Sequence, residues 1–395
     1  MKFSYFSGII IILVLVTCAC SSSKKSLTQP LIWNKQRLDT IIQKTYFNDT
    51  LLNKYITPTN YLLQKTSVSI VQKPFTISGD IHNYESLSTY YWPDPSNPQG
   101  PYIHKDGKIN PDVKKYDSTR LKELCDRLKY FSIAYYLTKN ELYYQAFIEQ
   151  IKIWYINKNT KMNPNLEYAQ IIIGKNDNHG QPHGIIDAYI MNDIIEAIRL
   201  INSVKKIDRR VLKEVISWHY QFFNWLNKSK LAQIEKCQPN NHGIALDILK
   251  LNIALFVGKN DVANEITSSF YNNRLEKQID SIGRQPYELK RTKAYMYSIY
   301  NLMHIVDFCC LQESLGNPYY KKHYEIINRA FLYLYQFVGK HEKFPYQEID
   351  NWNRLEKWLK IEILRLHRLQ QPPNSKALNI GYTYDFYKSM NDIIK

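Results

Sequence analysis

Apolar residues recur three or four positions apart along most of this 395-residue sequence, and this spacing constrains the fold more than any other feature. One such stripe consists of Leu121, Leu124, Cys125, Leu128, Phe131 and Tyr135. Because an α-helix turns once in about 3.6 residues, these side chains share one face, which has to be buried. Comparable stripes occupy roughly residues 142–156, 185–202, 210–228, 244–257, 296–315, 321–337 and 354–369.

The order of these stripes predicts the fold class. Alternating strand patterns are scarce, and short polar or Pro/Gly breaks separate one stripe from the next. Antiparallel helix pairs without a βαβ rhythm indicate an all-α domain, either an α/α toroid or a solenoid. The sequence lacks the fixed-period repeat of solenoid arrays, so we expect an α/α toroid, an incomplete barrel of antiparallel helix pairs.

The first twenty residues have the pattern of an export signal. Lys2 provides a positive start, residues 8–16 are apolar, and small residues and cysteines follow. These cysteines resemble a bacterial lipobox, and we expect Cys20, which follows the small Ala19, to be lipidated, with Cys18 as the alternative. An ordinary cleaved signal is the other interpretation, and the polar Ser/Lys run after Cys20 argues against it.

This pattern divides the chain into three parts. Residues 1–20 are the predicted signal peptide, 21–35 a tether, and 36–395 one helical domain. The protein is therefore expected to be exported and held in the cell envelope by its lipid, on the periplasmic or outer-membrane face. Within the domain, residues 73–117 form the longest non-helical stretch, and long loops in compact domains usually serve a function.

The charge of the chain predicts an acidic partner. The formal net charge is +16, which raises the local concentration of polyanions. Nucleic acid is disfavoured because the chain combines an export signal with no recognisable nucleic-acid-binding motif. An anionic polysaccharide outside the cytoplasm fits better; a basic surface without any partner is the alternative.

No metal or cofactor is predicted. The cysteines after the signal lack the C-x2-C spacing of zinc and redox sites. His179 and His183 have the spacing of a helical metal pair, but Gly180 and Pro182 between them forbid a regular helix.

Two polar segments are candidates for binding a sugar. Tyr90, Tyr91 and Trp92 stand before prolines in the long loop and would form a rigid aromatic platform, unless they only pack the loop onto the helices. The second segment carries Asn176, His179 and His183 on a turn that would present amide and imidazole donors to a carboxylated sugar.

Two further segments are candidates for chemistry. Asn240 and Asn241 precede an apolar helical run and suit helix capping, which does not explain the next residue, His242. Arg291 lies six residues before Tyr297; if that segment is helical, the two point about 120° apart, so that one side of the helix holds both near a ligand.

Four blocks, taken in order, resemble the alginate lyase superfamily. They are S-G-D-x-H-x-Y-x-S-L with Y-W-P-D-P, M-N-P-N-L-x-Y-A-Q with G-I-I-D, N-N-H-G, and R-T-x4-Y-S-x2-N-L, and they span about residues 75–305. The best match is the branch of polysaccharide lyases that act on polymannuronate and polyglucuronate. This resemblance implies an α/α toroid that cleaves an acidic uronate polymer by β-elimination.

The resemblance also implies which residues act. An Asn-His pair and a downstream Arg and Tyr form the family's catalytic site, and they match Asn241, His242, Arg291 and Tyr297. We expect Asn240 to join the substrate-binding residues. Better-known alginate lyases carry an aromatic pair soon after the histidine, whereas this chain has Gly-Ile-Ala at 243–245, which leaves the identity of the uronate open.

Two other functions remain as alternatives. A helical-toroid glycoside hydrolase would need two positioned carboxylic acids, for which Asp187 and Asp247 are available. A non-catalytic, helical glycan-binding lipoprotein would share the anchor and the charge but has no need for the Asn-Asn-His and Arg/Tyr blocks together.

Overall fold

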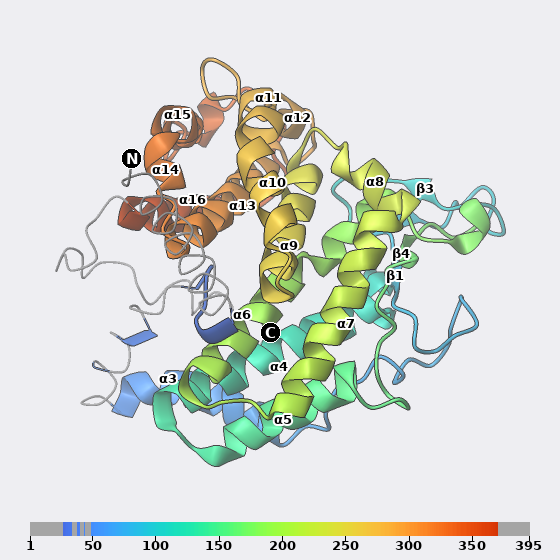
Figure 1. The fold of residues 1–395 in the computed structure, drawn as a ribbon. Helices are drawn as coiled ribbons and strands as arrows, with labels where there is room; N and C mark the ends of the chain where they lie inside the picture. The colour runs from blue at the N-terminus through green and yellow to red at the C-terminus, as the bar shows by residue number, and fades with distance from the viewer. Residues whose placement is uncertain (1–26, 34–37, 40–42, 44–48, 370–395) are drawn as a thin grey trace, which may run out of the picture.

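The computed structural model describes residues 27–33, 38–39, 43 and 49–369, and most of this part of the chain is helical (Figure 1). The longer helices are α3 (Asp49–Leu63), α4 (Asp117–Thr138), α5 (Glu141–Tyr155), α6 (Met191–Val204), α7 (Arg209–Lys228), α9 (Asn241–Phe256), α10 (Asn260–Phe270), α13 (Ala294–Ser314), α15 (Tyr324–Tyr335) and α16 (Trp352–Leu369). The shorter ones are α8 (Lys230–Lys236), α11 (Glu276–Gln278), α12 (Pro286–Leu289) and α14 (Tyr319–Lys322). The 3-10 segments are η1 (Pro111–Lys115), η2 (Asn176–Asn178), η3 (Pro182–Ile190) and η5 (His341–Lys343), and η4 (Tyr271–Leu275) is a π turn.

The apolar stripes of the sequence coincide with these helices, so the all-α prediction is confirmed. The stripe at 185–202 is shared between η3 and α6, and the stripe at 321–337 falls on the end of α14 and on α15.

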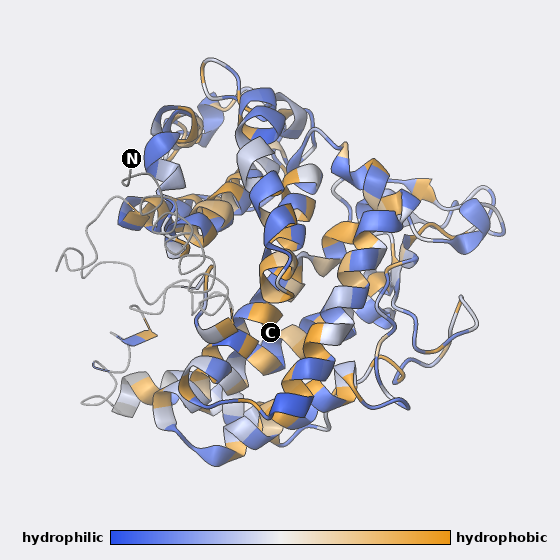
Figure 2. Ribbon diagram, in the orientation of Figure 1, coloured by the Kyte–Doolittle hydropathy of each residue, from blue (hydrophilic) through white to orange (hydrophobic). Residues whose placement is uncertain are grey.

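Packing explains why some helices are apolar on every side. Helices α4, α6, α9, α13 and α16 form a row in which each packs on the next, while α5, α7 and α10 pack against this row. Nearly all residues of α9 are buried, as expected for a helix covered all round. The ribbon of α7 carries strongly hydrophilic as well as hydrophobic residues (Figure 2), as expected for a helix with one face in solvent.

Short strands shape the long loop at 73–117. Strand β1 (Glu85–Leu87) pairs in parallel with β4 (Tyr168–Ile171), and β2 (Tyr91–Trp92) pairs antiparallel with β3 (Ile103–His104). The buried carboxylate of Asp117 accepts from Lys73 Nζ at 2.6 Å and from the Glu85 amide at 2.9 Å. The two ends of the loop are thereby tied together at the start of α4.

A buried carboxylate on α6 holds an N-terminal segment. Glu196 Oε2 accepts hydrogen bonds from the backbone amides of Leu31, Ile32 and Trp33 at 2.7, 2.8 and 2.9 Å, and Glu196 Oε1 pairs with Arg199 at 2.6 Å. The predicted tether at 21–35 includes residues 27–33, and the bonds from Leu31, Ile32 and Trp33 to Glu196 hold this part of it against α6. The predicted signal, including Cys20, lies outside the described residues.

No helix among the described residues is long and apolar enough to cross a membrane.

Replacing Glu196 by Ala is expected to lower the free energy of unfolding by about 3–5 kcal/mol, because it removes the carboxylate that neutralises the buried Arg199 and accepts from three backbone amides. Denaturant unfolding measures this loss. Glu214→Ala, on the exposed side of α7, is the matched control and should change stability by less than about 0.5 kcal/mol. Equal losses in the two variants would show that the buried carboxylate has no special role.

Candidate active site

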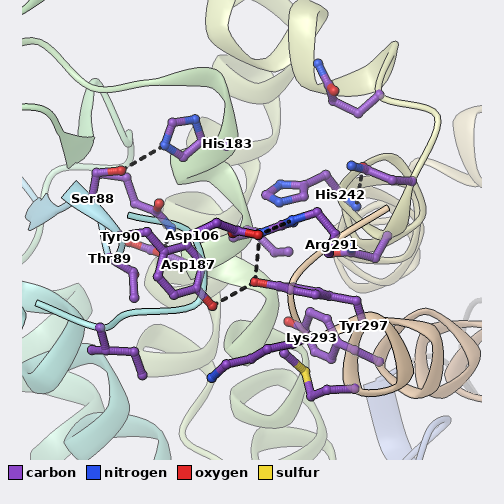
Figure 3. Close-up of a pocket in the computed structure, with 18 of the residues that line it drawn as sticks. Ser88, Thr89, Tyr90, Asp106, His183, Asp187, His242, Arg291, Lys293 and Tyr297 are labelled. Carbon is purple, nitrogen blue, oxygen red and sulfur yellow. Dashed lines mark hydrogen bonds and ion pairs between the residues drawn. The ribbon is translucent and has the colours of Figure 1, made fainter. Parts of the chain in front are cut away.

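One cavity of about 1040 Å³ brings together residues from the long loop, η3, α8, α9, the α12–α13 connection and α16 (Figure 3). The residues predicted to act together from the sequence, Asn241, His242, Arg291 and Tyr297, all line it. They come from two segments about fifty positions apart, so the tertiary fold creates the site.

The start of α9 positions Asn241 and His242. Asn240 Oδ1 accepts from the His242 amide at 3.2 Å and caps the helix, as its sequence position predicts. A Cβ at Gly243 would lie 2.2 Å from the Gln238 carbonyl oxygen, so only glycine permits this close approach. The local N-N-H-G sequence therefore serves the geometry of one helix start.

Buried carboxylates stand behind both side chains. Glu235 Oε1 lies 2.6 Å from His242 Nδ1, which orients the ring and leaves Nε2 to meet a ligand. Glu288 accepts from the backbone amide of Asn241 at 2.6 Å and from Asn241 Nδ2 at 2.8 Å. Burial, opposed by the hydrogen bonds from Asn241, raises the pKa of Glu288 to about 7.

Arg291 is held by the long loop. Asp106 Oδ1 accepts from Arg291 Nη2 at 2.8 Å, and Asp106 Oδ2 accepts from Thr292 Oγ1 at 2.9 Å. A Cβ at Gly107, where φ is +74°, would lie 2.6 Å from Thr292 Oγ1, so the loop approaches this closely because glycine follows the aspartate. Burial opposes ionisation of Asp106, but hydrogen bonds from Arg291 and Thr292 outweigh it and lower the pKa of Asp106 to about 2.

Tyr297 meets two partners in the cavity. Arg291 Nη2 donates to Tyr297 Oη at 3.0 Å, and the Tyr90 and Tyr297 hydroxyls lie 2.7 Å apart, pointing toward one another (Figure 3). Burial, with the neighbouring Tyr90, raises the pKa of Tyr297 above its usual range, although Arg291 acts in the opposite direction. In the free protein this side chain is therefore a neutral phenol.

The relation of Arg291 to Tyr297 differs in one respect from the sequence interpretation. Helix α13 begins at Ala294, so Arg291 lies on the connection before the helix and reaches Tyr297 from there. Tyr295 and Tyr297 are two positions apart on α13 and therefore face opposite ways: Tyr295 is fully buried and donates to the Leu334 carbonyl at 3.0 Å, away from the cavity.

Four of the predicted substrate-binding residues line the cavity, namely Tyr90, Tyr91, His183 and Asn240. The ring of Tyr91 lies against that of His104, with centroids 5.0 Å apart. His183 is 3.0 Å from Ser88 Oγ, and burial, with repulsion from His242, His104 and Arg291, lowers the pKa of His183 to about 4. His183 is therefore neutral near pH 7.

The other predicted substrate-binding residues, Trp92, Asn176 and His179, are not brought to this cavity. Trp92 Nε1 donates to the Lys108 carbonyl at 2.8 Å within the loop. His179 stacks on Tyr168 with ring centroids 5.1 Å apart. The contact of Trp92 packs the long loop. The sequence had left this role open as the alternative to a sugar platform.

Sequence reasoning missed the acidic residues that hold the site. Asp106, Glu235 and Glu288 each contact a predicted catalytic side chain, yet none belongs to a pattern that singles it out. The only local signal is Asp106 followed by glycine, which marks a turn.

The two aspartates considered for hydrolysis are separated. Asp187 lines the cavity and accepts from Ser86 Oγ, Gln170 Nε2 and Tyr84 Oη at 2.6, 2.8 and 3.0 Å. Asp247 pairs with Arg274 at 2.7 Å and is not part of the cavity lining. The pair of opposed carboxylates that a hydrolase needs is not formed by these residues.

The cavity of this helical domain groups an amide, an imidazole, a guanidinium and a phenol, the set of side chains that the resemblance to polysaccharide lyases implies. The alginate lyase family model matches residues 67–344 of this chain, and the chain belongs to that family. No curated protein matches it.

Solved structures give the same assignment. An alginate lyase from Bacteroides ovatus is 31% identical, with a TM-score of 0.82 over 88% of this chain and 98% of that chain. A tyrosine-to-phenylalanine variant of alginate lyase A1-III, an enzyme of Sphingomonas species A1, complexed with tetrasaccharide, is 12% identical, with a TM-score of 0.51 over 85% of this chain and 86% of that chain. The second likeness concerns the fold alone, and with the first it confirms the predicted α/α toroid.

Proposed function

We propose that this protein cleaves an acidic uronate polymer, polymannuronate or polyglucuronate, by β-elimination, leaving an unsaturated uronate end. The observation that carries the proposal is the meeting of Asn241, His242, Arg291 and Tyr297 in one cavity. Membership of the alginate lyase family supports the reaction class.

The reaction makes three demands on the site. The C5 proton of a uronate is weakly acidic because its removal delocalises charge into the adjacent carboxylate. The C5–H bond breaks, a C4–C5 double bond forms, and the C4–O bond breaks as its oxygen takes up a proton. The protein therefore has to neutralise the carboxylate, accept the C5 proton and supply a proton to the departing oxygen.

The described side chains meet these demands. The start of α9 places Asn241 and His242 at the cavity to bind the carboxylate; Glu235 orients the His242 ring, while the donors of Asn241 face Glu288 in the free protein. Arg291 adds a fixed positive charge beside them, stabilising the charge that grows in the transition state. Tyr297, at 3.0 Å from Arg291, serves as base and acid on one face of the sugar.

Burial makes it easier for Tyr297 to act as the acid than as the base. The phenol form is favoured in the free protein, and it carries the proton that the departing oxygen needs. Forming phenolate at pH 7 costs about 4 kcal/mol for an ordinary tyrosine, and burial adds to this cost. Arg291 offsets part of it, which explains why the guanidinium lies over the Tyr297 ring, 4.0 Å from its centroid.

Basic side chains beside the cavity support an anionic substrate. Lys293 and Arg354 line it. Lys105 lies over the Trp92 ring and Lys175 over the Tyr91 ring, at 5.4 and 5.6 Å from the centroids. Asp350 pairs with both Lys293 and Arg354, so Lys105 and Lys175 are left beside the cavity to attract a polyanion.

The direct test is to incubate the purified protein with polymannuronate, polyguluronate, polyglucuronate and hyaluronan and to follow the ultraviolet absorbance of the unsaturated product. A lyase of the proposed kind raises the absorbance with polymannuronate or with polyglucuronate. Reducing ends without absorbance would identify a hydrolase, and binding without either product a glycan-binding protein.

Tyr297→Phe is expected to lower kcat by at least about a hundredfold with a smaller change in KM, because only the acid–base hydroxyl is removed. Tyr295→Phe is the matched control on the opposite side of α13 and should retain most activity, losing about 1 kcal/mol of stability with its hydrogen bond to Leu334. If both variants stay folded and active, tyrosine is not the base, and His242 takes that role.

Salt is expected to raise the apparent KM steeply, because ions screen the attraction between the protein, with its net charge of +16, and a polyanion; the Debye length is about 10 Å at 0.1 M salt. Steady-state kinetics over a range of sodium chloride concentrations measures the effect. A KM that stays constant would remove charge steering from the mechanism.

We also propose that the protein is exported and anchored in the cell envelope by a lipid on Cys20, on the evidence of the lipobox-like sequence. Cys20→Ala should abolish incorporation of labelled palmitate and release the protein from membranes, whereas Cys18→Ala should leave both unchanged. The reverse result would move the lipid to Cys18, and labelling of neither would leave an ordinary cleaved signal.

A further inference from the structure

The contact between Glu288 and Asn241 leaves the Asn241 amide facing the wrong way for its proposed role. Both donors of Asn241, the backbone N–H and Nδ2, bond to Glu288, which is 1% exposed. The amide atom that remains is Oδ1, which is buried and has no hydrogen-bond partner. An amide oxygen only accepts hydrogen bonds, and so does a carboxylate, so this orientation does not bind a uronate.

Rotating the Asn241 side-chain amide by half a turn solves this problem and creates another. The rotation presents Nδ2 to the cavity but turns Oδ1 toward Glu288 Oε2. Two acceptors repel each other when Glu288 is ionised. When Glu288 is protonated, its O–H donates to Oδ1, while its other oxygen still accepts from the Asn241 amide N–H.

We propose that Glu288 is a positioning residue that holds a proton in the substrate complex and, by donating it to Asn241 Oδ1, turns Asn241 Nδ2 toward the uronate carboxylate. This inference rests on the proposed function. Glu288 does not line the cavity, so it acts on the substrate only through its hydrogen bonds to Asn241.

The surroundings of Glu288 favour the protonated form of its carboxyl group. The charged and titratable groups facing it are His242 on α9, Arg291 after α12 and Tyr300 on α13. His242 and Arg291 favour ionisation, but burial outweighs them and raises the pKa to about 7. A bound uronate adds negative charge to the same cavity, which further favours the protonated acid.

The sign of the pH dependence follows. Glu288 is protonated below about pH 7, so binding is strongest there, and kcat/KM should fall about tenfold per pH unit well above 7. Glu288→Gln imitates the protonated acid, because its carbonyl accepts from the Asn241 N–H and its amide donates to Oδ1. Glu288→Ala does neither.

The first experiment compares these two variants over a range of pH. Glu288→Ala should raise KM by about tenfold or more, Glu288→Gln should recover most of that loss, and the decline of kcat/KM above pH 7 should disappear in Glu288→Gln. A Glu288→Gln variant as poor as Glu288→Ala, or one that keeps the alkaline decline, would overturn the proposal by showing that the ionised carboxylate is the working form or that another group titrates.

The second experiment does not depend on turnover. Calorimetry in buffers of different ionisation enthalpy, at pH 8, measures protons taken up when Tyr297→Phe binds an oligosaccharide of the polymer that the wild type cleaves fastest. Uptake of a fraction of a proton, lost when Glu288→Gln is added, supports the proposal; equal uptake in both variants contradicts it and leaves the lyase function standing. A wild type that cleaves no polymer defeats the proposed function itself, and this inference with it.

Discussion

Asp106 and Arg291 are 185 positions apart, and their contact at 2.8 Å holds the two halves of the cavity together. The same aspartate accepts from Thr292, and the same guanidinium donates to Tyr297. One partly buried ion pair therefore joins the long loop to the start of α13, and its arginine also positions the Tyr297 hydroxyl. The loop also delivers Tyr90 to within 2.7 Å of Tyr297, a contact that depends on the loop staying where Asp106 holds it.

Two buried glutamates contact the side chains that are proposed to bind the uronate carboxylate. Glu235 supports His242, and Glu288 supports Asn241. The hydrogen bond to Glu235 fixes the His242 ring before substrate arrives, which lowers the reorganisation needed in the transition state, whereas the bonds to Glu288 hold the Asn241 amide in the orientation that substrate binding has to reverse. Both acids lie close to the proposed carboxylate site, so the protonation of Glu288 becomes part of substrate recognition.

Local features of the chain were predictable wherever a local cause produces them. Apolar spacing located the helices, and the side chain of Asn240 signalled the start of α9, because both depend on residues a few positions apart. The opposite directions of Tyr295 and Tyr297 followed from helical geometry in the same way. For Trp92 the sequence left both a sugar platform and loop packing open, because the choice depends on the Lys108 carbonyl, which the fold of the loop brings to the indole.

The sequence by itself determined the all-α class, the positions of the helices and four motif blocks whose order identifies the family. Only the tertiary structure decided which of their side chains meet. It brought His183 to the cavity and left His179 stacked on Tyr168, and it chose Asp106, Glu235 and Glu288 as partners for the predicted catalytic residues. The physical reason is that helical periodicity is a short-range property of the chain, whereas a buried hydrogen bond or ion pair depends on where distant segments pack.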